Sequence, residues 1–396
     1  MSAAVSNVLK MEGNFSPFDW SGSTIYSAAF VGQGTDAAFF SQLHADQIRA
    51  EINLRGVLRH VWQVDEISVQ RAELNLVGPK IPVQTRDSAA GVSRSPSFLP
   101  KRVEITRAII QETNVTWNGG GLAGVALTLM PQNDSWQITG DGGRCVQQGW
   151  PSFAIDHFKM RYRHPSLFVT AAELKTDDAG TIQLDGEIAS TQSYQFHTKL
   201  DGVPITPLLR EDWRARLKGK LAGDVNVRSG SVGAPQIDGK LSMSAGQLEA
   251  LPVLDQIAIF TRTEQFRTLA LHKASANFVQ DGGKLTVTQF AAESEGLLRI
   301  EGDFFVESGT IDGTFQVGLT PASLQWLPGS EAKVFTVARG GYLWTPMKVS
   351  GPLEHPREDL SERLVAAAQD TLIEGVGNAV EKTKRDIQDI LSPLTH

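Results

Sequence analysis

The sequence predicts a mostly β protein that forms a long, curled antiparallel β-sheet, either a groove or a partly open barrel. Apolar and polar residues alternate over most of the chain, which puts one set of side chains on each face of a sheet. A short phrase with a glycine after an acidic residue or a lysine recurs within these strands, as in Ile182–Ile188 (IQLDGEI) and Ile311–Val317 (IDGTFQV). Helical periodicity is confined to two segments.

The glycine of the recurring phrase has a structural interpretation. The phrase also occurs in Leu217–Val227 (LKGKLAGDVNV), Ile237–Met243 (IDGKLSM) and Leu298–Val306 (LRIEGDFFV). A glycine inside a strand leaves a gap in a row of side chains and permits bulges or bends, which a curling sheet needs. The acids before it occupy one repeated place, so we interpret them as markers of strand bends rather than as catalysts: Asp185, Asp238, Glu301 and Asp312.

Composition bounds the class of protein. The chain has 396 residues, 41% of them hydrophobic, which is enough for one elongated β domain or two to three compact ones. The formal net charge is 37 minus 44, or −7, and the basic residues are scattered, so we expect no nucleic-acid partner. A single cysteine, Cys145, excludes an internal disulfide framework and a cysteine-based zinc site.

The elements follow in order along the chain. Residues 1–78 form a predicted N-terminal β segment, with strands at Thr24–Val31 and Ala45–Leu54 and a pair of strands within Val57–Val77. Residues 79–100 are rich in proline and serine and lack periodicity, which predicts a flexible loop or linker. Residues 101–355 are predicted as one repeated β-sheet region. Its strands before the recurring phrase are Val103–Trp117, Val125–Met130, Trp136–Thr139, Phe153–Tyr162 and Leu167–Leu174.

Two segments have helical spacing. Leu251–Leu269 predicts a short helical insert near residues 252–269, with Pro252 close to its start, where proline is tolerated. Residues 356–396 form a predicted helical tail, in which apolar residues recur about every four positions over Glu358–Leu391. The tail is interpreted either as an amphipathic helix on a membrane or a partner, or as a cap over an open end or edge of the sheet.

Motifs of catalysis and cofactor binding are weak. Val31–Ala37 (VGQGTDA) matches a dinucleotide fingerprint, with Glu51 at a plausible distance for a ribose contact. The chain lacks the alternating strands and helices that this motif requires, so we interpret it as a glycine-rich turn between strands. No two of the eight histidines lie three or four residues apart, and no G-x-S-x-G elbow is present. We therefore expect no catalytic residues, no cofactor and no metal.

The chain resembles the AsmA-like superfamily, bacterial envelope proteins related to TamB. The resemblance is strongest over Leu248–Leu364, where KLTVTQFAAESEGLLRIEGDFF and IDGTFQVGL precede TPMKVSGPLEHPREDLSERL. A weaker similarity covers Val5–Val77. The resemblance implies a curled sheet with an apolar interior in the periplasm, usually tethered to the inner membrane by an N-terminal helix. The sequence contains no such anchor, so it is a truncated start, a processed form or a soluble variant. Its opening residues run directly into strand-like alternation, so we expect a segment upstream of Met1.

The leading hypothesis is a non-enzymatic envelope protein that handles lipids. The resemblance implies phospholipid transport and outer-membrane biogenesis, with lipid, the inner or outer membrane and other envelope proteins as partners. An alternative is a structural or protein-binding scaffold that assists outer-membrane protein assembly, and a dinucleotide enzyme is a third hypothesis. The candidates for a groove that shields acyl chains lie on the apolar strand positions: Leu221, Val225, Val227, Ile237, Leu241, Met243, Leu285, Val287, Leu298, Ile300, Phe304, Val306, Phe315 and Val317.

Overall fold

The structure, a computed structural model, is dominated by β-strands. It describes residues 11–36, 38, 40–78, 80, 102–148, 150–177, 179–190, 193–230, 234–249, 258, 264, 267–324 and 330–367. The structure is 72% strand and 9% helix. The strands belong to one sheet of 24 strands. The prediction of a mostly β protein with a curled sheet is therefore confirmed.

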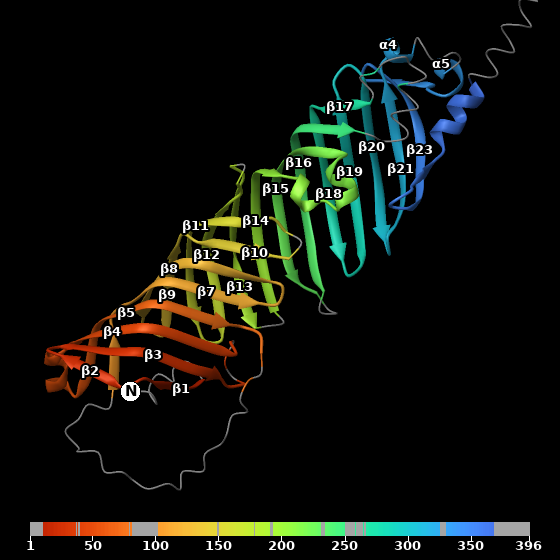
Figure 1. The fold of residues 1–396 in the computed structure, drawn as a ribbon. Helices are drawn as coiled ribbons and strands as arrows, with labels where there is room; N and C mark the ends of the chain where they lie inside the picture. The colour runs from red at the N-terminus through yellow and green to blue at the C-terminus, as the bar shows by residue number, and fades with distance from the viewer. Residues whose placement is uncertain are drawn as a thin grey trace, which may run out of the picture. The chain divides into compact units, whose positions relative to one another are not determined.

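Contacts divide the chain into two compact units. Unit 1 comprises Met1–Val203 with Val227–Ser229, and unit 2 comprises Pro204–Asn226 with Gly230–His396. The colours of Figure 1 run from red to yellow-green along the described part of unit 1 and from green to blue along that of unit 2. The division falls inside the region 101–355, which the sequence predicts as one repeated sheet.

Unit 1 is built from hairpins of long strands. Its strands are β1 (Met11–Phe15), β2 (Phe18–Ser21), β3 (Thr24–Gly34), β4 (Gln42–Asn53), β5 (Val61–Asn75), β6 (Arg102–Ile105), β7 (Ala108–Trp117), β8 (Gly120–Gln132), β9 (Ser135–Asp141), β10 (Arg144–Gln147), β11 (Phe153–Arg163), β12 (Ser166–Lys175), β13 (Thr181–Ser190) and β14 (Ser193–Pro204), whose last residue belongs to unit 2. Buried apolar side chains form three clusters in this unit, around Phe30, Val64 and Val125.

Two pairings of unit 1 depart from the antiparallel prediction. β5 pairs parallel with β6 and with β7, whereas the other strand pairs among the described residues of the unit are antiparallel. A parallel pair needs a long return connection between its strands. The chain between Asn75 and Arg102 supplies that length. It contains the predicted linker 79–100, which lies outside the described residues except for Lys80.

The predicted pair of strands within Val57–Val77 is wrong. The structure has one strand there, β5, preceded by a 3-10 helix, η1 (Leu54–Arg59). The register between β4 and β5 shifts between Glu51 and Ile52. Such irregularities bend a strand without ending it.

Unit 2 contains the remaining strands and a few short helices. The strands are β15 (Leu217–Ser229), whose last three residues belong to unit 1, β16 (Pro235–Glu249), β17 (Thr268–Leu271), β18 (Lys273–Asp281), β19 (Lys284–Ser294), β20 (Leu298–Glu307), β21 (Thr310–Leu319), β22 (Val337–Arg339), β23 (Tyr342–Pro352) and β24 (Arg357–Glu358). The helices are η2 (Thr206–Leu208), α2 (Glu211–Arg214), α4 (Pro321–Leu324) and α5 (Ser330–Lys333), with residues 360–367 also helical.

Most of the predicted helical insert lies outside the described residues. Ala258 within it is helical and buried. Its predicted end is wrong, because Thr268 and Leu269 belong to β17, which pairs with β16. Of the predicted tail, residues 360–367 are helical as expected, and residues 368–396 lie outside the described part.

Candidate functional site

One face of the sheet in unit 2 is apolar across six neighbouring strands. β16, β18, β19, β20, β21 and β23 pair antiparallel in that order. Opposed residues of an antiparallel pair project from the same face, so the register aligns side chains into rows that cross the strands. The row at one end, here named the open row, contains Ile237, Gln280, Leu285, Val306, Ile311 and Gly351. The row at the other end, the sealed row, contains Ser294, Leu298, Leu319 and Leu343.

The sealed row is covered by other parts of unit 2. Leu298 is 2% exposed and Leu319 is 0% exposed. They belong to a buried cluster that also contains residues from α4, from the residues after α5 and from the helical residues 360–367: Leu324, Val334, Phe335, Leu360, Leu364 and Ala367. At this end, the apolar face is an ordinary protein core.

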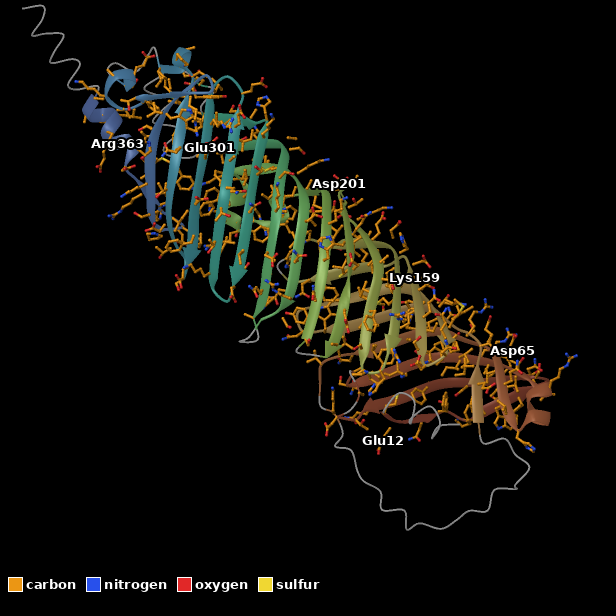
Figure 2. All side chains as sticks on the ribbon, turned by 180° about the vertical axis from the view of Figure 1, so that it is seen from behind. Glu12, Asp65, Lys159, Asp201, Glu301 and Arg363 are labelled. Carbon is orange, nitrogen blue, oxygen red and sulfur yellow. The ribbon has the colours of Figure 1, made fainter. Side chains whose placement is uncertain are left out.

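Polar contacts fix the helical residues 360–367 on the sheet. The Oε2 atom of Glu358 accepts the backbone N–H of Leu360 at 2.6 Å and that of Ser361 at 3.0 Å, which caps the first turn. Arg363, labelled in Figure 2, donates from Nη1 to Thr345 Oγ1 at 3.0 Å and from Nη2 to the carbonyl oxygen of Pro346. The described part of the tail therefore packs on the sheet, as the cap interpretation predicts.

The aliphatic side chains of the open row are more exposed than Leu298 and Leu319 of the sealed row. Ile237, Leu285, Val306 and Ile311 are each partly exposed. In the described part of the chain they belong to none of the four buried clusters. The apolar face of unit 2 thus passes from a covered end to an end where large aliphatic side chains meet solvent.

The fourteen candidate groove residues differ in exposure, and the difference does not simply follow this gradient: Val287, next to the open row, is buried, whereas Ile300, next to the sealed row, is partly exposed. Five are buried: Leu221, Val287, Leu298, Phe315 and Val317. The other nine are partly exposed: Val225, Val227, Ile237, Leu241, Met243, Leu285, Ile300, Phe304 and Val306. Val227 belongs to unit 1 and the other thirteen to unit 2. For Leu298, Phe315 and Val317, which lie in the covered cluster, the interpretation as core is the simpler one.

On the apolar face of unit 2, Gly239, Gly302 and Gly313 of the recurring phrase each lie opposite a phenylalanine ring. Gly219 and Gly223, in the phrase of β15, are instead approached by Met243 and by the backbone of Lys240 and Leu241. Gly302 is paired directly with Phe315, and a methyl group added at Gly302 would come within 2.7 Å of the Phe315 ring and 2.5 Å of the Thr314 carbonyl oxygen. The same direct pairing occurs at Gly140 with Phe158, Gly186 with Phe196, Gly239 with Phe278 and Gly313 with Phe304. The predicted gap in the side-chain row is therefore filled by a ring from the next strand.

The acids before these glycines lie on the opposite, polar face. Glu301 pairs with Arg299 at 2.7 Å and with Arg339 at 2.6 Å. The interpretation of the acids as bend markers is wrong for Asp312, because the register of β21 with β20 and with β23 runs without a shift. At Glu301 the β20–β21 register is also unshifted, but the β19–β20 register shifts opposite Gly302 and Phe304. The bulge lies in β19, between Val287 and Phe290.

A different acid supports that bulge. Asp303, which follows the glycine of the phrase, accepts the backbone N–H of Gln289 on its Oδ1 atom at 2.7 Å. Gln289 has a positive φ of 52°, and the bulge leaves its N–H without a partner in the ladder. A depression of about 630 Å³ on these strands includes Lys284, Asp303 and Thr314 of the polar face among its lining residues.

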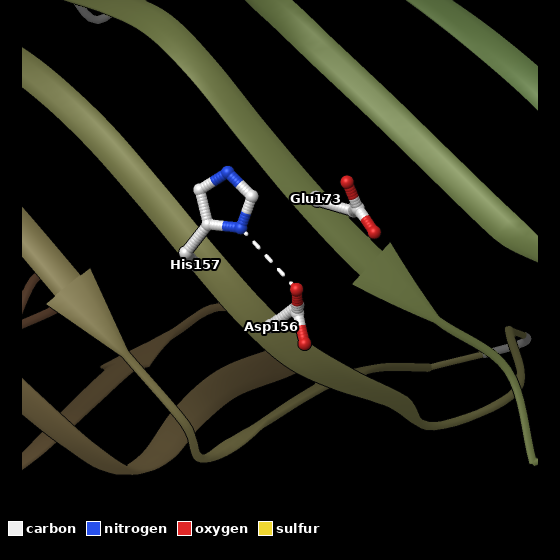
Figure 3. A group of neighbouring side chains, drawn as sticks. All are labelled: Asp156, His157 and Glu173. Carbon is white, nitrogen blue, oxygen red and sulfur yellow. Dashed lines mark hydrogen bonds and ion pairs between the residues drawn. The ribbon is translucent and has the colours of Figure 1, made fainter.

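One cluster of possible metal ligands occurs among the described residues. Asp156, His157 and Glu173 bring ligand atoms within 4.8 Å of one another (Figure 3). His157 and Glu173 are opposed across β11 and β12, and a bulge between Ile155 and His157 adds the carboxylate of Asp156. The sequence analysis missed this cluster.

Lys175 already pairs with both carboxylates of the cluster. Its Nζ atom lies 2.8 Å from Asp156 Oδ1 and 3.8 Å from Glu173 Oε1. The hydrogen bonds from Lys175 and His157 lower the pKa of the Asp156 carboxyl group, and the bond to Asp156 raises the pKa of Lys175. A divalent cation would have to displace this ammonium group, so the contacts favour a surface ion network.

The glycine-rich motif of β3 does not form a phosphate loop. Val31, Gly32 and Gly34 lie within the strand rather than in a turn, so the interpretation of this motif as a turn is wrong for them. Gly32 is opposed to Gly13 and closely approached by Met11 and Phe30, which explains the small residue there. Glu51 pairs with Arg49 at 2.7 Å.

Comparisons with protein families, with curated proteins and with solved structures found no match. Among the described residues, no helix combines the length and the apolar character that crossing a bilayer requires.

Proposed function

We propose that this protein is a non-enzymatic lipid-handling protein that binds acyl chains along the open row of unit 2. Its proposed place is the periplasm, in association with the inner membrane, and its proposed role is phospholipid transport for outer-membrane biogenesis. The compartment and the role rest on the AsmA-like resemblance, whereas the binding surface rests on the gradient of exposure along the apolar face.

The single observation that supports binding is the partial exposure of four aliphatic side chains in one row, which Gln280 interrupts between Ile237 and Leu285. Leu285, Val306 and Ile311 are direct neighbours across three strands, and Ile237 continues the row beyond Gln280. The four side chains span five strands, which at a spacing of about 4.8 Å gives a length of about 19 Å. One leaflet of a bilayer has a hydrocarbon depth of about 15 Å, half of the core. The row is long enough for one acyl chain, and each methylene buried there contributes about 0.8 kcal/mol.

The test places an added carboxylate on either face of the β20–β21 hairpin and compares the effects on lipid binding. Val306→Asp puts a carboxylate in the open row, and Thr314→Asp puts one on the exposed polar face of β21. We expect the purified wild-type chain to bind phospholipid in native mass spectrometry. Val306→Asp should weaken binding by at least about tenfold with little change in melting temperature, because the site is partly exposed. Thr314→Asp should bind as the wild type does.

A third variant distinguishes a loss of lipid binding from a loss of folding. Leu319→Asp lies in the sealed row, where a buried charge should unfold unit 2 rather than selectively remove binding. The proposal fails if the wild-type chain neither carries nor takes up phospholipid, or if Val306→Asp binds it with wild-type affinity.

A further inference from the structure

The polar face of unit 2 has a depression that the proposed function does not use. Its volume is about 630 Å³, and it lies on β19, β20 and β21, which carry part of the open row on their other face. Small-molecule sites in proteins have volumes of about 300 to 1,000 Å³. Three strands at a spacing of about 4.8 Å make the depression about 10 Å wide. Its residues from Glu301, labelled in Figure 2, to Phe305 make it about 14 Å long.

One aromatic ring in the depression is open to solvent. Phe305 is 36% exposed, and it opposes Thr286 on one neighbouring strand and Asp312 on the other. Directly opposed side chains project from the same face and lie about 5 Å apart. The Phe305 ring is therefore flanked by a hydroxyl group and a carboxylate, whereas the ring of Phe304 contacts other rings of the apolar face.

Two of the three carboxylates that line the depression already have partners. Glu301 pairs with Arg299 and with Arg339, and Asp303 accepts the backbone N–H of Gln289. The third carboxylate, on the residue opposite Phe305, makes no side-chain hydrogen bond or ion pair within the described part of the chain. The depression thus keeps one carboxylate that is free to accept hydrogen bonds from a ligand.

The lysine of the depression makes a cationic ligand unfavourable. The Nζ atom of Lys284 lies 4.7 Å from the centre of the Phe305 ring and 3.9 Å from Glu307 Oε2. Its ammonium group already occupies the position that a ligand cation would take over the ring. An anionic ligand would in turn meet the unpaired carboxylate of Asp312. The charges therefore favour a neutral, polar ligand.

The remaining polar side chains suit a ligand with hydroxyl groups. Thr286 and Thr288 of β19 and Gln316 of β21 make no side-chain hydrogen bond among the described residues. Hydroxyl and amide groups both donate and accept, and an ionised carboxylate accepts on two oxygens. A sugar ring has hydroxyl groups at its edge and C–H groups on its faces, and the C–H groups pack against aromatic side chains. The depression therefore offers partners for both parts of a sugar.

We propose that this depression binds a neutral oligosaccharide. One sugar ring packs its C–H groups against the exposed part of Phe305, and Asp312 accepts hydrogen bonds from the hydroxyl groups of that ring. Gln316 binds hydroxyl groups of the next ring along the depression. The site shares no side chain with the open row, so it goes beyond the proposed acyl-chain binding and is tested separately from it.

Saturation-transfer NMR of the full chain with neutral disaccharides tests the site. The probes are maltose, cellobiose and diacetylchitobiose, and we expect at least one of them to bind. Phe305→Ala should weaken that binding by at least about tenfold, because it removes the apolar contact. Asp312→Asn should weaken it by about threefold or more, because it removes a charged acceptor from an exposed position without a change of shape.

The matched control is Phe168→Ala in unit 1. Phe168 also lies under a basic side chain, with Arg161 5.1 Å from the centre of its ring, and it does not line the depression. This variant should bind the disaccharide as the wild type does. Melting temperatures of all variants distinguish lost binding from unfolding.

The proposal is overturned if the wild type binds none of the three disaccharides, or if Phe305→Ala and Asp312→Asn bind with wild-type affinity. An equal loss in Phe168→Ala also overturns it. Binding of spermidine without binding of any disaccharide would show a cation site instead. Val306→Asp should retain disaccharide binding, since its side chain projects from the other face, so a failure of acyl-chain binding remains distinguishable.

Discussion

Single residues explain why glycine recurs in the strands. A ring that lies across a glycine needs the space that any side chain would occupy, and the ring in turn covers the exposed backbone of the glycine. In unit 2 the rings of Phe290, Phe304 and Phe315 also contact one another, with centroids 5.8 to 6.2 Å apart. The glycines are thus part of the packing of the apolar face.

Gly302→Ala should destabilise the protein by about 1 to 3 kcal/mol, because the added methyl group meets both the Phe315 ring and the Thr314 carbonyl oxygen. Chemical denaturation would measure the change. Gly283→Ala is the matched control, since its added methyl group meets no atom within 4 Å. Equal stability of the two variants would contradict the packing role of Gly302.

The pKa of Asp156 should depend on Lys175. Lys175→Met removes the hydrogen bond that lowers the pKa of Asp156 most, so this pKa should rise toward the ordinary value of a carboxyl group. The stabilisation from the lowered pKa is present above the ordinary carboxyl pKa and is lost as the pH falls through the lowered one. NMR titration of the carboxyl carbon would measure the shift. Lys159→Met, on β11 like Asp156, should leave the pKa of Asp156 unchanged. An unchanged pKa of Asp156 in Lys175→Met would show that Lys175 does not lower it.

At the scale of elements, the helical residues 360–367 decide which end of the apolar face is core. Leu360 and Leu364 are buried against the sheet, whereas Val365 on the same helix is 39% exposed. The helix is held by its own apolar side and by the contacts of Arg363, so its removal would expose the sealed row.

Leu364→Ala should therefore cost about 2 to 5 kcal/mol, the range for truncating a buried leucine. Val365→Ala should change stability by less than about 1 kcal/mol. Urea unfolding of both variants provides the comparison. If Leu364→Ala unfolds at the wild-type midpoint, the helix does not contribute to the core of unit 2.

The elements also mark the limits of sequence prediction. Alternation was enough to predict most strands, because the period of two depends on each strand alone. The curl of the sheet was predicted from the glycines inside the strands. It was not enough for the parallel pairing of β5 with β7, which depends on a return path through the predicted linker. The bulges had a signal that was not used: the apolar positions Phe153 and Ile155 shift by one residue to Phe158 and Met160.

That shift also explains the missed side-chain cluster. The one-residue change of phase at Asp156 brings its carboxylate to the face of His157, and the register adds Glu173 from the next strand. The phase change could have been seen in the sequence, but the partner strand and its register could not. The open and sealed rows likewise have the same alternation, and only tertiary contacts distinguish them.

At the scale of the whole molecule, net charge and apolar exposure act together on solubility. The chain carries a net charge of −7 and has a pI of about 5.7. Charge repulsion between copies of the protein disappears near that pH, where exposed apolar side chains promote association.

Self-association measured by light scattering should accordingly peak near pH 5.7. Val306→Asp should reduce the peak, because it adds charge to the open row, and Thr314→Asp should reduce it less. If the two variants scatter equally at that pH, the open row does not drive association.

The pairing of each strand with a near neighbour in sequence has a consequence for how such a sheet changes its length. From β18 to β21 each strand pairs with the next one along the chain, and the open row crosses all of them. Duplication of one hairpin would add two strands and lengthen that row by about 10 Å without altering any existing pair. Under the proposed function, the number of hairpins would therefore set the length of the longest acyl chain that the row could bind.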